Sequence, residues 1–202
     1  MMSQDQNRST TPARITKDIL NLCRRIDPTQ EPIWVPVKPW HKGDASFCFF
    51  NVRDKVAQDG GKVQHGWIIW ENPNILVEAE FHAIWVSPEN KPIDITPKED
   101  GEAHILFIPD GIRVWEGELV ENIRVPLVDN AYTRQLIKYS EEMFRLRKKY
   151  YKDGQSLMPL EEILKVQEQF SAPAKNLNRM PVSRNKRCSC GSGKKYKKCC
   201  GA

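Results

Sequence analysis

Residues 66–97 read GWIIWENPNILVEAEFHAIWVSPENKPIDITP, and this stretch decides the fold. Its apolar runs are interrupted by Asn-Pro-Asn at 72–74 and Pro-Glu-Asn at 88–90, which are turn signals. Strands that are joined by such short turns pair antiparallel. The stretch therefore predicts three consecutive antiparallel strands, at 66–71, 75–86 and 92–96.

The sheet is expected to continue beyond this stretch. A further strand-like run at 103–108 follows an Asp-Gly turn, and shorter runs at 112–115 and 118–125 have the composition to extend the sheet. The pattern indicates a central antiparallel sheet of about four to six strands.

Helical patterns flank these strands. Residues 14–26 carry apolar residues at helical spacing, with Cys23 predicted to pack in the core. A helix at 47–58 has Ser46 as its expected N-cap and two glycines at its exit. A third helix begins near Asp129, and its apolar stripe is expected to lie on the sheet. The predicted fold class is α+β, with helices that pack against the central sheet.

Composition divides the chain into four parts. Residues 1–13 are rich in Ser, Thr, Gln and Asn, with almost nothing apolar, which predicts disorder. A globular domain is predicted at 14–155, and a short helix with a linker follows at 156–187. The last part, 188–202, is rich in cysteine and is too short to have a core of its own.

The formal net charge of +5 belongs to the end of the chain. Residues 171–202 hold nine Lys or Arg and no Asp or Glu, so the rest carries a net negative charge. No apolar run approaches the ~20 residues of a membrane span. The first residues, MMSQDQNRSTTPAR, lack the apolar stretch of a secretion signal. We expect a cytoplasmic protein in which only the basic tail suits contact with nucleic acid or acidic lipid.

Four of the six cysteines cluster near the C-terminus. Cytoplasmic thiols stay reduced, and adjacent cysteines bond to each other only with strain, which disfavours disulfides. Zinc prefers four thiolate or imidazole ligands in a tetrahedron. When the protein supplies all four, no coordination position is left for a reacting water. The predicted cofactor is a structural Zn²⁺, and the predicted ligands are Cys188, Cys190, Cys199 and Cys200.

The same residues resemble a known motif. Arg184-Asn185, followed by Cys188-x-Cys190-Gly-Ser-Gly-Lys-Lys-Tyr-Lys-x-Cys199-Cys200-Gly201, is similar to the SEC-C motif, the zinc-binding tail of the SecA translocase. In SecA this tail contacts the SecB chaperone, ribosomes and acidic phospholipids. The resemblance therefore implies a protein partner, such as a SecB-like chaperone or the ribosome, or an acidic lipid. The SecA motor itself is absent.

A second constellation lies in the main domain. If the turn after the 75–86 strand is centred on residue 88, then His82 and Asp94 face each other across a hairpin. A carboxylate in that place holds one imidazole nitrogen and fixes the tautomer. Cys48 is expected in the first turn of the 47–58 helix, where the helix dipole favours a thiolate.

The chain order Cys48, His82, Asp94, with the wording His-Ala-x-Trp…Asp-x-Thr-Pro, resembles papain-like and transglutaminase-like enzymes. The resemblance spans about residues 44–110. It implies a papain/transglutaminase-like sheet and thiol-dependent acyl transfer, that is proteolysis, deamidation or amidation. In that chemistry Cys48 attacks, His82 carries the proton and Asp94 orients His82.

Other interpretations stay open. Cys48 is equally suited to be a buried thiol at a helix–sheet contact, with His82 and Asp94 forming a structural hydrogen bond. A metal site of Glu78, Glu80 and His82 is disfavoured, because no second histidine lies at ligand spacing. Two functions remain: a cysteine hydrolase or transferase directed to its target by the zinc tail, and a non-enzymatic adaptor that binds protein, ribosome or acidic lipid.

Overall fold

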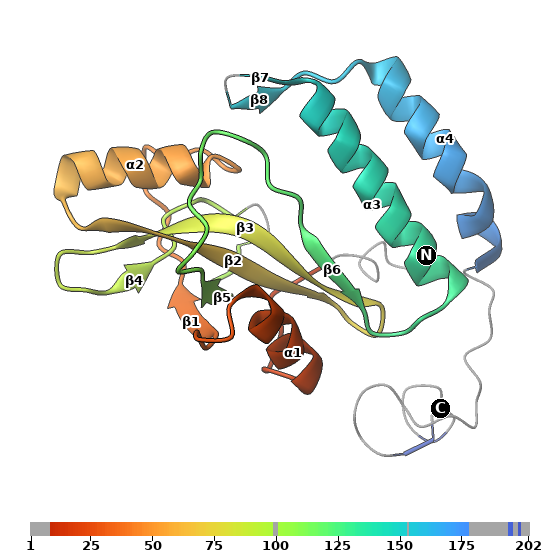
Figure 1. Cartoon of the computed structure of the whole chain (residues 1–202), viewed down its shortest axis with the longest axis horizontal. Helices are drawn as coiled ribbons and strands as arrows, with labels where there is room; N and C mark the ends of the chain where they lie inside the picture. Colours follow the sequence, from red (N-terminus) through yellow and green to blue (C-terminus); the bar gives the residue numbers. More distant parts are fainter. Residues whose placement is uncertain (1–8, 99–100, 153, 178–193, 196–197, 199–202) are drawn as a thin grey trace.

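The computed structural model describes residues 9–98, 101–152, 154–177, 194–195 and 198 (Figure 1). The helices are α1 (Lys17–Ile26), α2 (Cys48–Asp59), α3 (Ala131–Lys149) and α4 (Leu160–Leu177). The strands are β1 (Ile33–Pro36), β2 (Lys62–Asn72), β3 (Leu76–Val86), β4 (Pro92–Ile93), β5 (His104–Pro109), β6 (Ile123–Pro126), β7 (Tyr151–Lys152) and β8 (Gln155–Ser156). The predicted α+β class and antiparallel sheet are confirmed.

Five strands curl into a nearly closed barrel. They follow the order β1-β5-β2-β3-β4, every neighbouring pair is antiparallel, and β6 adds to the edge of β3. The chain just after β1 then returns to the chain just after β4. There Lys38 N donates to Asp94 O at 2.8 Å, and Asp94 N donates to Pro36 O at 3.0 Å. These two bonds join the sheet's first strand to its last.

Alternation along the strands gives the barrel wall two apolar faces. One set of side chains gathers within the curve of the sheet: Val35, Ile68, Ile84, Ile105 and Phe107. The other set faces outward, where Ile19 and Leu22 of α1 pack against strand residues such as Ile69 and Leu106. α2 covers another part of the outer wall, where Val52 packs on Ala83. Cys23, on the inner face of α1, is buried in the same cluster as Ile19 and Leu22, as expected.

The helix starts differ from the predicted ones. α1 begins three residues later than expected, and its N-cap is Thr16, whose hydroxyl accepts from Ile19 N at 3.3 Å. α2 begins at Cys48, and its N-cap is Phe47, which makes no side-chain capping bond. Ser46 is therefore not the cap. It instead has φ 65°, a left-handed conformation that is uncommon for a residue other than glycine.

The shorter strands also differ. The strand predicted at 92–96 ends after two residues, because Asp94 pairs with the chain beside β1. β1 lies in a proline-punctuated stretch that carried no strand prediction. The run at 112–115 forms no strand, and the run predicted at 118–125 is a strand only as β6.

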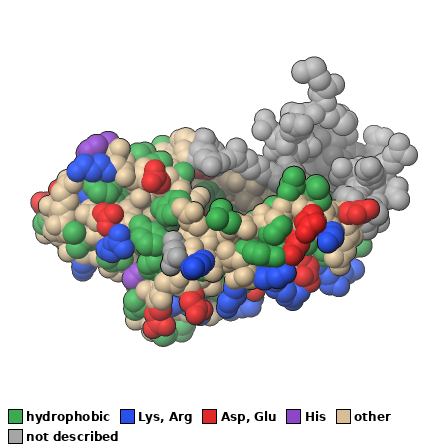
Figure 2. Space-filling view, turned by 90° about the horizontal axis from the view of Figure 1, so that it is seen from above, with side chains coloured by type: hydrophobic (Ala, Val, Ile, Leu, Met, Phe, Trp, Pro, Cys, Tyr) green, Lys and Arg blue, Asp and Glu red, His purple; other side chains and the backbone are tan. Residues whose placement is uncertain are grey.

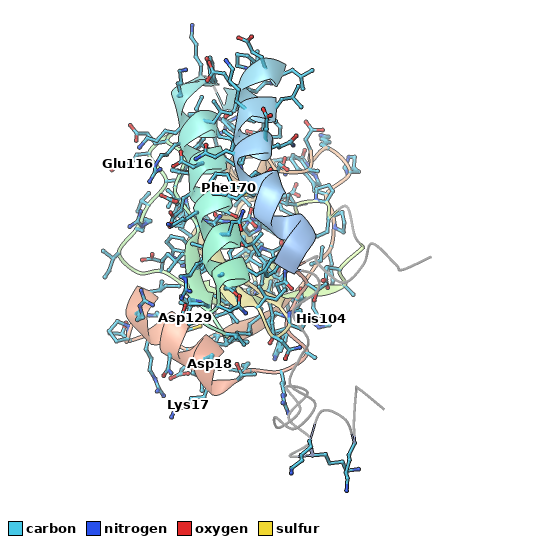
Figure 3. The ribbon with its side chains drawn as sticks, turned by 90° about the vertical axis from the view of Figure 1, so that its right-hand side faces the viewer. Lys17, Asp18, His104, Glu116, Asp129 and Phe170 are labelled. Atoms are coloured by element: carbon cyan, nitrogen blue, oxygen red, sulfur yellow. The ribbon has the colours of Figure 1, made fainter. Side chains whose placement is uncertain are left out.

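Helix α3 packs mainly against α4, which differs from its expected place on the sheet. The two helices lie side by side (Figure 3), and the Tyr139 and Phe170 rings meet edge-on with centroids 5.7 Å apart. Gln135 Nε2 also donates to Phe170 O at 2.9 Å. The helix predicted near residues 160–170 is longer, because it continues along α3 to Leu177.

Candidate active site

His82 and Asp94 form a buried pair, as the sequence predicted. His82 Nε2 lies 3.1 Å from Asp94 Oδ2, and the two residues are 4% and 0% exposed. The predicted register was wrong: Trp85 pairs with Ile93, so the turn is centred one residue later than expected. His82 and Asp94 are therefore diagonal neighbours, at a separation that an aromatic side chain such as the imidazole of His82 can span.

Asp94 has two further partners. Lys98 Nζ lies 2.7 Å from the same oxygen that meets His82, and Thr96 N donates to Oδ1 at 3.0 Å. Burial on its own raises the pKa of Asp94, but His82 and Lys98 more than offset this and hold the pKa well below its usual range. A fully buried carboxylate is thus ionised and bound on both oxygens.

The same charges act on His82. Burial on its own lowers the pKa of this imidazole, whereas Asp94 and Cys48 raise it and Lys98 lowers it. The result is a pKa of about 9, so His82 is an imidazolium at neutral pH.

This shift makes stability depend on pH. Because the folded-state pKa of His82 is raised, its contribution is fully present below about pH 6.5 and is lost as the pH rises toward 9. We expect the free energy of unfolding to fall by on the order of 2 kcal/mol between pH 6.5 and 8.5. Urea titrations at several pH values check this. In His82→Gln most of this pH dependence of the free energy of unfolding should disappear. An unchanged pH dependence in that variant would mean that groups other than His82 cause it.

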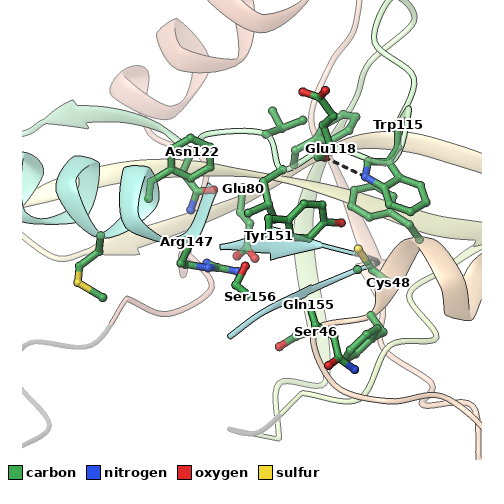
Figure 4. A pocket seen from close by; sticks show the side chains of 18 of the residues that line it. Ser46, Cys48, Glu80, Trp115, Glu118, Asn122, Arg147, Tyr151, Gln155 and Ser156 are labelled. Atoms are coloured by element: carbon green, nitrogen blue, oxygen red, sulfur yellow. Dashed lines mark hydrogen bonds between the residues drawn. The ribbon is translucent and has the colours of Figure 1, made fainter. Parts of the chain in front are cut away.

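Cys48 is the first residue of α2 and is 7% exposed. The prediction that it lies in the first turn is confirmed. It lines a cavity of about 690 Å³ between the start of α2, the middle of β3 and helix α3. Figure 4 shows Cys48 and Trp115 toward one end of this cavity, with Glu80 and Arg147 further along it. The hydrogen bonds of the described residues include none between Cys48 and His82.

A gap in strand pairing exposes β3 to this cavity. On the edge of β3 away from β2, β6 pairs only as far as Ala79, and β4 begins to pair at Trp85. Between them, residues 80–84 have no strand partner on that edge within the described part of the chain. His82 lies in this segment, and Glu80 and Phe81 line the cavity.

Aromatic rings form one wall of the cavity. Phe49 stacks on Trp115 with centroids 4.6 Å apart and planes at 7°, and Phe50 meets Trp115 edge-on at 5.1 Å. Trp115 Nε1 donates to Glu118 O at 3.0 Å, which fixes the indole (Figure 4). The β7–β8 hairpin closes in beside this wall, since a Cβ on Gly154 would lie 3.0 Å from the Phe50 ring. Nothing in the sequence predicted this wall, because Trp115 lies in a loop.

The three side chains of the alternative metal site, Glu78, Glu80 and His82, are each bonded to other side chains. Glu78 bonds Arg124 Nη2 at 2.8 Å, and Glu80 accepts from Trp70 Nε1 at 2.7 Å. His82 bonds Asp94. Within the residues that the structure describes, no group of three His, Cys, Asp or Glu side chains could hold a metal ion.

The predicted zinc ligands, Cys188, Cys190, Cys199 and Cys200, lie outside the described residues. Their donor chemistry, four thiols in a short segment, fits a structural zinc ion. Comparison with protein families bears on the same residues. Residues 184–202 match the SEC-C motif.

A relative found by sequence comparison is itself a SecA protein. The chain is 36% identical over 100 residues to the protein translocase subunit SecA of Wolinella succinogenes, a match that covers 50% of this chain and 10% of that protein. The chain is therefore distantly similar to a small part of SecA. No solved structure matches the chain. No helix in the described ranges is long and apolar enough to cross a membrane.

Proposed function

We propose that the main domain, residues 14–155, is a thiol-dependent acyl-transfer enzyme with Cys48 as nucleophile, His82 as proton carrier and Asp94 as the residue that orients His82. The hydrogen bond between His82 Nε2 and Asp94 Oδ2 carries this proposal. It engages the ring through one nitrogen and leaves Nδ1 to serve a thiol, which is the arrangement that nucleophile activation requires. The likeness to papain-like and transglutaminase-like enzymes remains part of the proposal.

The charges at the site suit a thiolate. Asp94 is anionic, while His82 and Lys98 are cationic, so a thiolate at Cys48 brings the four groups to a net charge of zero. The backbone amides at the start of α2 have no partner within the helix and favour negative charge nearby. The raised pKa of His82 keeps the ring an imidazolium at neutral pH, which is the form that stabilises a nearby thiolate.

In the proposed reaction the Cys48 thiolate attacks a carbonyl carbon and forms a tetrahedral oxyanion. Amide groups at the start of α2 donate hydrogen bonds to that oxygen. The His82 imidazolium gives its proton to the leaving nitrogen, the C–N bond breaks, and a thioester on Cys48 remains. Water or an amine then attacks the thioester carbonyl while His82 takes up the proton from it, the C–S bond breaks, and the acyl product leaves with the Cys48 thiolate and the His82 imidazolium restored. Hydrolysis or transfer follows from which of the two attacks.

Alkylation by iodoacetamide at pH 7, read residue by residue from peptide masses, tests the proposal. We expect Cys48 to react fastest, and His82→Ala to slow it by at least about tenfold, because the imidazolium partner of the thiolate is lost. Cys23 is an internal control, since burial and nearby Glu31 raise its pKa to about 11 and leave it a thiol.

A Cys48 as slow as Cys23, or a Cys48 rate that His82→Ala leaves unchanged, would remove the enzyme and leave the adaptor interpretation. Cys48→Ala confirms that the fast peptide is assigned correctly.

For the tail we propose that Cys188, Cys190, Cys199 and Cys200 hold one structural zinc ion and that the segment directs the chain to a partner. The match of residues 184–202 to the SEC-C motif favours this. The nine Lys and Arg of residues 171–202 suit an acidic partner: a SecB-like chaperone, the ribosome, acidic lipid or nucleic acid. On the face shown in Figure 2, by contrast, basic and acidic side chains are interspersed over the described residues.

Metal analysis of the purified, reduced chain tests the zinc site. We expect one zinc ion per chain, retained after dialysis, because structural sites bind with about 10–16 kcal/mol of free energy. Cys199→Ser should lose most of the zinc, whereas Cys48→Ala should keep it. Zinc that is absent from the wild type, or kept by Cys199→Ser, would contradict the proposed ligand set.

A further inference from the structure

Asn51 is a buried amide one turn after Cys48 on α2. It is 5% exposed, and all its polar side-chain atoms are bonded. Asn51 Oδ1 accepts from Asp44 N at 3.1 Å, and Nδ2 donates to Asp44 O at 2.8 Å. The amide therefore holds the backbone of the loop that leads into Cys48 by both its hydrogen-bonding groups.

The second bond of Nδ2 leads to the other half of the site. It reaches Thr96 Oγ1 at 3.3 Å, and Thr96 N donates to Asp94 Oδ1 at 3.0 Å. Asp94 in turn bonds His82. A continuous chain of contacts thus runs from the Cys48 loop through Asn51 and Thr96 to the imidazole.

Only a side-chain amide satisfies this arrangement. Asp44 presents an N–H and a C=O, so its partner must both accept and donate, which a carboxylate or an aliphatic group does not do. The loop also packs tightly on the amide: a Cβ on Gly43 would lie 3.3 Å from Asn51 Cγ. The loop contains Ser46 at φ 65°, a strained conformation that surrounding bonds must hold.

We infer that Asn51 is a positioning residue that holds the Cys48 loop in register with the Asp94–His82 pair. This inference rests on the proposed function, since it assigns Asn51 a part in arranging that same site. Asn51 acts through the residues that it bonds and does not itself contact the reacting atoms.

The pH profile of Cys48 alkylation tests the inference on the full chain. We expect Asn51→Leu to slow the reaction at pH 7 by about tenfold or more and to shift the profile, because the thiol no longer faces the imidazolium in a fixed geometry. Thr96→Val should change the profile in the same direction, and Thr96→Ser, which keeps the hydroxyl, should restore the wild-type profile. The double variant should be no slower than Asn51→Leu alone, since both changes break one chain of contacts.

Ile19→Ala is the matched control. Ile19 is a buried residue of α1 that makes none of these hydrogen bonds, so this variant loses stability and leaves the chain of contacts from Asn51 to His82 in place. It should keep the wild-type profile. If Asn51→Leu does not fold, the Thr96 pair of variants gives the answer alone.

The two failures are distinguishable. A wild-type Cys48 whose reaction does not depend on His82 overturns the proposed function. A Cys48 that depends on His82 but has the same profile in folded Asn51→Leu, or in Thr96→Val where Asn51→Leu does not fold, overturns only the role of Asn51. An equal change of profile in Ile19→Ala overturns it as well.

Discussion

Asp94→Ala is expected to destabilise the fold by about 3–5 kcal/mol, because it removes the anion from between two buried or nearly buried cations. His82 and Lys98 both contact one oxygen of Asp94, and their side chains are 5% and 10% exposed. With the carboxylate gone, the burial of His82 lowers its pKa, and the ring loses its proton near neutral pH. Urea unfolding at pH 7 measures the loss, and an NMR titration of the His82 ring measures the change in its pKa.

Asp59→Ala is a suitable control for this variant. Asp59 also bonds a lysine four residues away, Lys55, but at the surface, so its removal should change stability little. If Asp94→Ala is as mild as Asp59→Ala, the buried charges do not stabilise the fold, and the balance of charge at the proposed site must be reconsidered.

Gly66→Ala should be at least as damaging, costing about 3 kcal/mol or more, because the barrel wall leaves no room for a side chain there. An added Cβ would lie 2.3 Å from the carbonyl oxygen of Ile108 and 2.4 Å from the Phe107 ring. Gly66 is also the register partner of His82 on β2. We therefore expect the variant to weaken β2–β5 pairing and to lower the stability measured by urea.

Gly111→Ala provides the comparison. There the nearest atom would be Asp27 Oδ2 at 3.5 Å, an ordinary contact, and stability should change by no more than about 0.5 kcal/mol. Full stability in Gly66→Ala would mean that the Phe107 ring does not cover this position in the folded protein.

The long strands of the fold were predictable because their signals are local. The apolar runs and turn signals of residues 66–97 are sufficient to find β2 and β3, which pair with each other across a short turn. β1 was not predictable, since four residues beside prolines become a strand only through pairing with distant β5. The packing partner of α3 was also not predictable from the sequence, because the apolar stripe of α3 can pack on either the sheet or α4.

At the site, the His82–Asp94 pair could be predicted from hairpin arithmetic even though its register was one residue out. Lys98 and Asn51 could not, as their roles depend on contacts made by the folded loops. Their only signals were spacing: Lys98 follows Asp94 by four residues, and Asn51 comes one turn after Cys48.

The joining of Lys38 to Asp94, which closes the barrel, has a consequence for how the protein matures. Contacts that are far apart in sequence form late, because closing a long loop costs chain entropy before any bond rewards it. The main-chain bonds that fix Asp94 belong to this late step. The His82–Asp94 pair would then reach its final geometry only when the chain beside β1 docks on the chain beside β4.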